Sequence, residues 1–113
     1  MSYSTRFLNK TVTVVMDRPM GTRHPNFHPL YYIQNYGYIP NTKAPDGEEI
    51  DAYVLGVLEP IKEFAGKCIA VIHRTDEDDD KLVVVPSGVE FTDEEIRALT
   101  QFQERLHKSV ILR

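Results

Sequence analysis

Hydrophobic and polar residues alternate in the first patterned stretch of the chain. Val12, Val14 and Met16 fall on one face of an extended chain, and Thr11, Thr13, Val15 and Asp17 fall on the other. A period of two is typical of a half-buried strand. The pattern predicts a strand here, with Asp17 at its end and facing away from the apolar row.

Three further runs are rich in apolar or β-branched residues, and turn or charged residues bound each of them. They cover 52–58, 67–73 and 81–86, and each predicts a strand. The last two are joined by the polar link 74–80, which is short enough for an antiparallel hairpin. In contrast, 18–45 carries many Pro and Gly residues and favours turns and short extended pieces.

The pattern changes near the C-terminus of the sequence. Thr92 and Glu95 have the spacing of a capping box, and hydrophobic residues then recur at helical intervals: Ile96, Leu99, Phe102 and Leu106. Short strands followed by one amphipathic helix predict a mainly β (α+β) fold. We expect a small antiparallel sheet or barrel with the helix against one opening. A doubly wound α/β fold is disfavoured because helices do not alternate with strands.

Composition and charge narrow the functional classes. The chain has 113 residues, of which 42% are hydrophobic, and this predicts one domain over 1–113. A formal net charge of -4 argues against nucleic acid as a partner. We find no signal-like h-region and no apolar run long enough for a bilayer, so we expect a soluble, cytoplasmic protein. The single cysteine, Cys68, lies in an apolar run and is expected to be buried.

Acidic residues cluster where the run 52–58 begins. Asp46 and Glu48 share a face of an extended chain, whereas Asp51 has the opposite parity. Asp51 and Asp46 therefore converge only if the chain bends at Gly47. A second acidic group, 76–80, forms the tip of the predicted hairpin.

Either acidic turn alone is typical of a solvated surface. Together they concentrate carboxylates, whose repulsion Mg²⁺ or Mn²⁺ would offset by oxygen coordination. A multi-metal site at one rim follows if the strand that begins at Asp51 neighbours the strand that ends near His73. A zinc site at His24 and His28 is the rival interpretation, but no Cys or third His lies nearby.

Three segments together resemble the soluble family I inorganic pyrophosphatases: 35–40 (Asn-Tyr-Gly-Tyr-Ile-Pro), 46–51 (Asp-Gly-Glu-Glu-Ile-Asp) and 76–86. Their order and placement also match. The resemblance implies an OB-like five-stranded barrel with a flanking helix. It also implies Mg²⁺-dependent hydrolysis of inorganic diphosphate to two phosphates by metal-activated water, with Mn²⁺ as the alternative ion.

The resemblance further implies individual roles. The metal ligands would be Asp46, Asp51, Asp76 and Asp79. Glu48 would help to activate the attacking water, Tyr36 and Lys81 would contact phosphate oxygens, and Asp17 stands where the family has an acid on its first strand. Lys81 and Tyr36 are thus both catalytic and substrate-binding candidates.

The chain departs from the family pattern at three places. The segment 19–36 is short and lacks the cations that the family carries there, and Arg18, Arg23 and His24 are the candidates to replace them. Glu48 replaces an Asp. The family's Tyr-Lys pair falls at Leu106 and His107, with Lys108 one residue later.

These departures leave two alternatives open. The chain hydrolyses another phosphoanhydride, or it is a non-catalytic barrel that binds metal, phosphate or a protein subunit. Exposed strand edges also lead us to expect a homo-oligomer.

Overall fold

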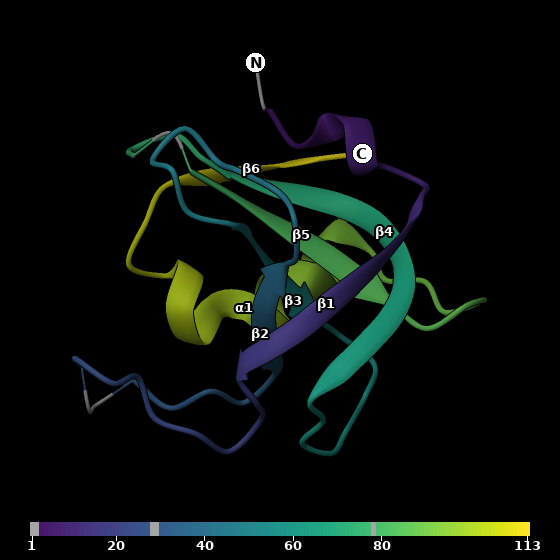
Figure 1. Ribbon diagram of the computed structural model, residues 1–113. Helices are drawn as coiled ribbons and strands as arrows, with labels where there is room; N and C mark the ends of the chain where they lie inside the picture. The colour runs from purple at the N-terminus through teal and green to yellow at the C-terminus, as the bar shows by residue number, and fades with distance from the viewer. Residues whose placement is uncertain (1–2, 28–29, 78) are drawn as a thin grey trace.

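Five strands close into a barrel in the computed structural model, which describes residues 3–27, 30–77 and 79–113 (Figure 1). The strands are β1 (Thr11–Arg18), β2 (Asn35–Ile39), β3 (Ile50–Val54), β4 (Glu63–Arg74) and β5 (Asp79–Val85). They follow the order β1-β2-β3-β5-β4, and pairing between β1 and β4 closes the ring. This confirms the mainly β, OB-like five-stranded barrel.

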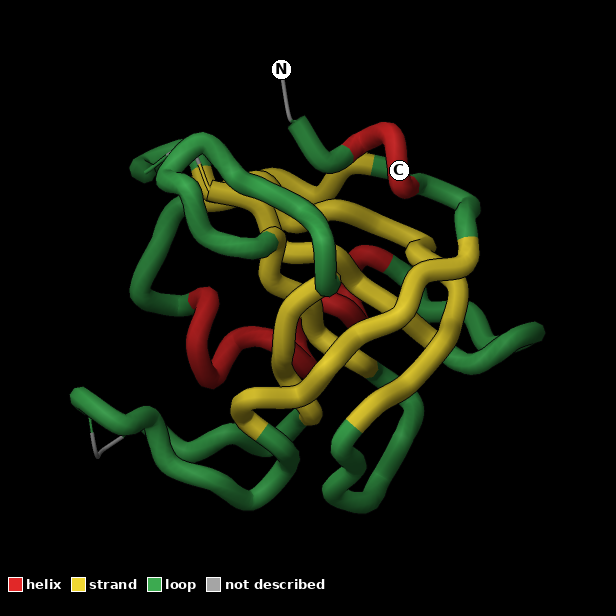
Figure 2. The backbone as a smooth tube through the Cα atoms, viewed as in Figure 1, coloured by secondary structure: helices red, strands yellow, loops and turns green. Residues whose placement is uncertain are grey.

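The remaining elements lie outside the ring. A short 3-10 helix, η1 (Thr5–Phe7), precedes β1, α1 (Asp93–Glu104) follows β5, and β6 (Ser109–Leu112) pairs with the end of β4. Figure 2 shows the strands wrapped around one centre, with the helix beside them. No helix in the described part of the chain is both long enough and apolar enough to cross a membrane.

Alternate residues of the barrel strands fill its interior. Val12, Val14 and Met16 pack there as the alternation predicted, together with Ala52 and Val84 from facing strands. Cys68 is also buried in this core, as expected. The half-exposed and charged side chains of β1 therefore face outward.

The helix packs on the outer face of the barrel wall. The outward residues Tyr53 and Val83 form a second core with Ile96 of α1, and Leu99 and Phe102 pack against it. The expectation that α1 covers a barrel opening is therefore wrong. The reason is that β3 and β5 are apolar on both faces, so their outer face also needs a cover.

The capping box of α1 is confirmed, because Thr92 Oγ1 accepts from the Glu95 backbone N–H and Glu95 Oε1 accepts from the Thr92 N–H. The helix ends at Glu104, so Leu106 lies beyond it despite its helical spacing.

The antiparallel hairpin of β4 and β5 is confirmed, and its neck pairs Arg74 with Asp79. However, β3 pairs with β5 in parallel, so the barrel is not antiparallel throughout. The condition for a metal site at one rim, that β3 and β4 are neighbours, is not met, because β5 lies between them. The parallel register sets Asp51 beside Lys81.

The strand ends also differ from the prediction. The run 52–58 is strand only within β3, and β4 begins earlier than the run 67–73. The breaker-rich region contains β2, whose Gly37 lies against β1: a Cβ there would stand 2.0 Å from the Val15 carbonyl oxygen. Glycine therefore allows a strand where its frequency suggested turns.

Candidate active site

Lys81 is the centre of a charged cluster on the outer face of the barrel. Its side chain is 4% exposed, and its Nζ lies 2.6 Å from Asp51 Oδ2 and 2.8 Å from Asp79 Oδ2. The same ammonium lies 5.8 Å from the centre of the buried Tyr36 ring. Burial opposes the charge on Lys81, but Tyr36 and the neighbouring carboxylates outweigh it and raise the pKa overall. Lys81 is therefore cationic at neutral pH.

Asp79 is held through both of its carboxylate oxygens. Tyr3 Oη donates to Oδ1 at 3.3 Å, while Oδ2 contacts Lys81 and lies 3.7 Å from Arg74 Nη1. Burial acts to raise the pKa of Asp79, but Lys81 and Arg74 more than offset it, so the pKa lies below its ordinary value. This carboxylate is ionised and fixed in orientation.

Arg74 links the hairpin to the C-terminus of α1. Its Nε and Nη2 donate to the two carboxylate oxygens of Glu104, at 2.9 and 2.7 Å, and Nη1 donates to Glu77 at 2.7 Å. Both Arg74 and Glu104 are buried. This two-bond pair fixes the planar guanidinium at the edge of the site.

A hollow of about 390 Å³ opens beside this cluster, and we call it the cationic pocket. Arg18, Arg74 and Lys81 line it together with Asp51 and Tyr36. The rest of its lining is His24, Phe27, Leu30, Gln103, Leu106 and His107. Three of the lining residues are permanently cationic and one is a carboxylate. Acidic partners offset part of the charge of Lys81 and Arg74, but their positive groups still face the pocket and suit a polyanion.

Arg18 reaches this pocket because it ends β1. Its Nη1 donates to Tyr32 Oη at 3.0 Å. A β-bulge between Met16 and Arg18 leaves Asp17 as the extra residue of β1 opposite β2. Partial burial raises the pKa of Asp17, and the negative charges of Asp51 and Glu49 add to the rise.

A second hollow, the acidic hollow, lies next to the cationic pocket. Its volume is about 470 Å³, and its lining is Tyr3, Ala44, Pro45, Asp46, Glu77 and Asp79. Both acidic turns thus reach one rim, although β3 and β4 are not neighbours. Gly47, with φ of 90°, makes the expected bend. Asp46 and Asp51 nevertheless line different hollows, with Asp79 between them.

Three predicted site residues lie apart from this centre. Asp76 contacts His107 Nδ1 at 3.3 Å. Glu48 is exposed on the turn, where its backbone N–H donates to Asp46 Oδ1. Arg23 lies over the Tyr31 ring and is not among the residues that line the cationic pocket.

Two further residues of the sequence hypotheses, His28 of the zinc site and Asp78 of the acidic tip, lie outside the described residues. His24 Nδ1 accepts the backbone N–H groups of Asn26 and Phe27, both at 3.1 Å. That nitrogen is therefore already engaged and does not face a zinc ion.

The carboxylates fit a hard divalent cation by their chemistry. Asp46, Asp51 and Asp79 supply the oxygen ligands that such a cation prefers. In the described residues, no three His, Cys, Asp or Glu side chains already form a metal site. A metal would therefore draw carboxylates together from both hollows, in competition with Lys81.

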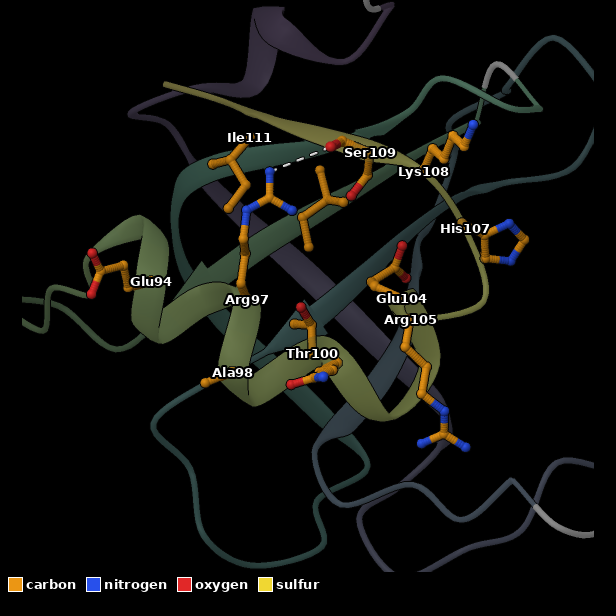
Figure 3. A pocket seen from close by; sticks show the side chains of 12 residues that line it. Glu94, Arg97, Ala98, Thr100, Glu104, Arg105, His107, Lys108, Ser109 and Ile111 are labelled. Carbon is orange, nitrogen blue, oxygen red and sulfur yellow. Dashed lines mark hydrogen bonds between the residues drawn. The ribbon is translucent and has the colours of Figure 1, made fainter.

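A third hollow, of about 710 Å³, lies between α1 and β6 (Figure 3). Arg97 crosses it and donates to the Ser109 carbonyl oxygen at 3.3 Å. Arg105, His107 and Lys108 point away from one another in Figure 3, so these basic groups do not converge on a ligand. The cationic pocket is therefore the better candidate site for an anion.

Sequence reasoning missed Arg74, Glu104 and Tyr3. Arg74 is the last residue of β4, directly before the acidic turn, and that position was a signal for a site cation. Glu104 and Tyr3 gave no such signal, because their partners are 30 and 76 residues away along the chain.

The fold and this pocket define a small β-barrel protein with a cation-lined pocket on its outer wall, flanked by carboxylates. The family model described as "Inorganic pyrophosphatase" matches residues 8–111. The chain belongs to the inorganic pyrophosphatase family, as the resemblance indicated.

Two relatives are inorganic pyrophosphatases of known organisms. The one from Pseudomonas aeruginosa is 38% identical over 80 residues, which are 67% of this chain and 42% of that protein. The one from Rickettsia felis is 30% identical over 110 residues, 93% of this chain and 60% of that protein. The chain thus spans about half the length of the relatives it matches.

A solved structure confirms the fold. The inorganic pyrophosphatase from Ehrlichia chaffeensis superposes with a TM-score of 0.71 at 20% identity, over 90% of this chain and 84% of that one.

Proposed function

We propose that this chain hydrolyses inorganic diphosphate to two phosphates with the help of a divalent metal, Mg²⁺ or its substitute Mn²⁺. The observation that carries the proposal is the cationic pocket, in which Arg18, Arg74 and Lys81 converge beside the carboxylates of Asp51 and Asp79. Diphosphate is a small and densely charged anion, so fixed cations stabilise both its binding and its reaction. Family membership supports the same substrate.

The phosphate groups would lie against Lys81, Arg18 and the Tyr36 hydroxyl. Arg74 faces the same pocket while Glu104 holds its guanidinium in place. Several donors that converge on one anion would orient the phosphate groups for in-line attack. Arg23 is proposed as an additional contact only if its loop moves towards the pocket.

The metal would be held by Asp46, Asp51 and Asp79, with Asp76 joining from the outer part of the hairpin. When bound, it supplies neutralisation of phosphate charge and acidifies a ligated water. Glu48 is the proposed acceptor of the proton from the attacking water. The oxygen of this water bonds to one phosphorus, the bond from that phosphorus to the bridging oxygen breaks, and two phosphates leave.

The ionic contacts of Lys81 also favour a second function. The Lys81 ammonium already contacts one carboxylate oxygen of Asp51 and one of Asp79, and this arrangement is stable without a metal. The second candidate is a barrel that binds phosphate or metal without turnover. In either case we propose a cytoplasmic protein that binds a small phosphate compound, and a homo-oligomer formed through strand edges such as β6.

Phosphate release from diphosphate tests the proposal. The wild-type chain with Mg²⁺ should release phosphate, and Asp51→Ala should lower the rate by at least about 100-fold, as the loss of one charge-stabilising group commonly does. Glu90→Ala, an exposed acid outside both hollows, is the matched control and should keep the wild-type rate.

Equal inactivity of wild type and Asp51→Ala across Mg²⁺ and Mn²⁺ concentrations would refute hydrolysis. Calorimetric binding of diphosphate by that inactive wild type would then establish the second candidate.

A further inference from the structure

One side of the cationic pocket is apolar. Phe27 and Leu106 line it although they are 48% and 53% exposed, and the buried Leu30 lies beside them. Single exposed hydrophobic residues are ordinary on protein surfaces. Here two of them share one hollow with three cations, and an inorganic diphosphate has no carbon atom to place against them.

The wall next to this apolar side is aromatic and uncharged. His24 Nδ1 accepts the N–H groups of Asn26 and Phe27, so the neutral ring carries its proton on Nε2. Burial and the charge of Arg18 lower the pKa of His24, which keeps the ring neutral. The ring is nearly parallel to that of Tyr32, at 19° and 6.4 Å between centroids.

The two halves of the pocket therefore suit different parts of one molecule. The cations lie on the barrel strands and suit phosphates, whereas Phe27 and Leu106 lie in the loops that follow β1 and α1. The volume of about 390 Å³ falls in the range of about 300 to 1,000 Å³ that organic ligands occupy in proteins.

We propose that the cationic pocket takes an organic phosphoanhydride, a diphosphate unit that carries an aromatic or aliphatic group. Lys81 and Arg18 hold the phosphates, and the carbon group packs on Phe27 and Leu106. The inference rests on the proposed function for the phosphate end of the site and adds the class of group that the other end accepts.

Calorimetry with non-hydrolysable ligands tests this assignment. The full chain with Mg²⁺ is titrated with methylenediphosphonate, with its adenosine ester and with its hexyl ester. The variants are Phe27→Ala and Leu106→Ala, with Leu58→Ala, 84% exposed and outside the pocket, as the control.

An ester should bind the wild type more tightly than methylenediphosphonate. Phe27→Ala should weaken that ester by at least about fivefold, the lower end of what stacking of a base on an aromatic ring contributes. The affinity of Phe27→Ala for methylenediphosphonate should stay within about twofold of the wild-type affinity. The affinities of Leu58→Ala for all three ligands should also stay within about twofold of the wild-type values. A loss confined to the adenosine ester identifies an aromatic group, and a loss confined to the hexyl ester identifies an aliphatic one.

Equal affinity of the three ligands overturns this inference and leaves the proposed function standing. Tighter, Phe27-dependent ester binding by a chain that releases no phosphate overturns hydrolysis and leaves the inference standing. A changed sedimentation coefficient of Phe27→Ala with unchanged ligand affinity also overturns it, because the apolar side would then be a contact between copies of the chain.

Discussion

At the scale of single residues, the site depends on how Asp79 and Arg74 are held. Each is fixed by a partner from a distant segment, Asp79 by Tyr3 and Arg74 by Glu104, and Asp79 is also paired with Lys81 of the same strand. Groups that orient a metal-binding carboxylate contribute to affinity without touching the metal. Tyr3 is such an orienting group for Asp79, because its hydroxyl donates to Asp79 Oδ1 and accepts a hydrogen bond from the Asp80 backbone N–H.

Tyr3→Phe should therefore weaken Mn²⁺ binding by roughly tenfold, because Asp79 loses the donor that orients it. The free energy of unfolding should fall by only about 1 kcal/mol for the lost hydrogen bonds. Calorimetric Mn²⁺ titration and urea unfolding measure the two quantities. Tyr31→Phe, at an exposed tyrosine, is the control, and equal Mn²⁺ affinity in both variants would show that Tyr3 does not position Asp79.

At the scale of elements, the position of the site follows from how the strands approach one another. The parallel pairing of β3 with β5 sets Asp51 beside Lys81. The close approach of β1 and β2 at Gly37 joins Arg18 and Tyr36, which are register partners and both line the cationic pocket. The pocket thus requires β1 and β2 to remain in contact.

Gly37→Ala should destabilise the barrel strongly. The added Cβ would lie 2.0 Å from the Val15 carbonyl oxygen and 2.7 Å from Met16 Cα, and these are backbone atoms that cannot rotate away. We expect a loss of at least about 3 kcal/mol in the free energy of unfolding, the upper range of overpacking costs. Thr13→Ala on the exposed face of β1 should change it by less than about 0.5 kcal/mol. A Gly37→Ala chain as stable as Thr13→Ala would contradict the close packing.

At the scale of the whole molecule, buried ion pairs tie the helix, hairpin and barrel together and make stability depend on pH. Glu104 joins α1 to Arg74 at the end of β4, and its Oε2 accepts from Tyr53 of β3. Burial alone would raise the pKa of Glu104, but hydrogen bonds and charge from Arg74 outweigh it and lower the pKa. A lowered carboxyl pKa stabilises the folded state above the unfolded pKa, and this contribution is lost as the pH falls through the folded pKa.

Glu104→Gln should lower the free energy of unfolding at pH 7 by about 3 kcal/mol, because Arg74 keeps its buried charge but loses its buried two-bond ionic partner. The difference from wild type should begin to shrink below pH about 4.3, the ordinary pKa of Glu, where Glu104 of the unfolded wild type takes up its proton. It should be lost as the pH falls through the lowered pKa of Glu104 in the folded state. Urea unfolding from pH 7 to pH 3 measures this, with the exposed Glu94→Gln as control. A difference that stays constant with pH would exclude ionisation of Glu104 as its cause.

The sequence by itself determined the local features of this protein. Alternation located β1, two apolar runs with a short link located the hairpin, and the capping box located the start of α1. Three short segments identified the family. All of these depend on residues near one another in the chain. It also marked Asp51 and Asp79 as site candidates by residue type, and Lys81 through the family resemblance.

Tertiary structure alone decided how those residues meet. The parallel pairing of β3 with β5, the strand hidden in the glycine- and proline-rich segment, and the helix on the outer wall all depend on contacts between distant residues. The same holds for Arg74, which joins the site because Glu104 orients it, and for Asp76, which lies beside His107 instead. Spacing along a chain gives the parity of a side chain within one strand, but long-range packing decides which strands are neighbours and therefore which charges share a pocket.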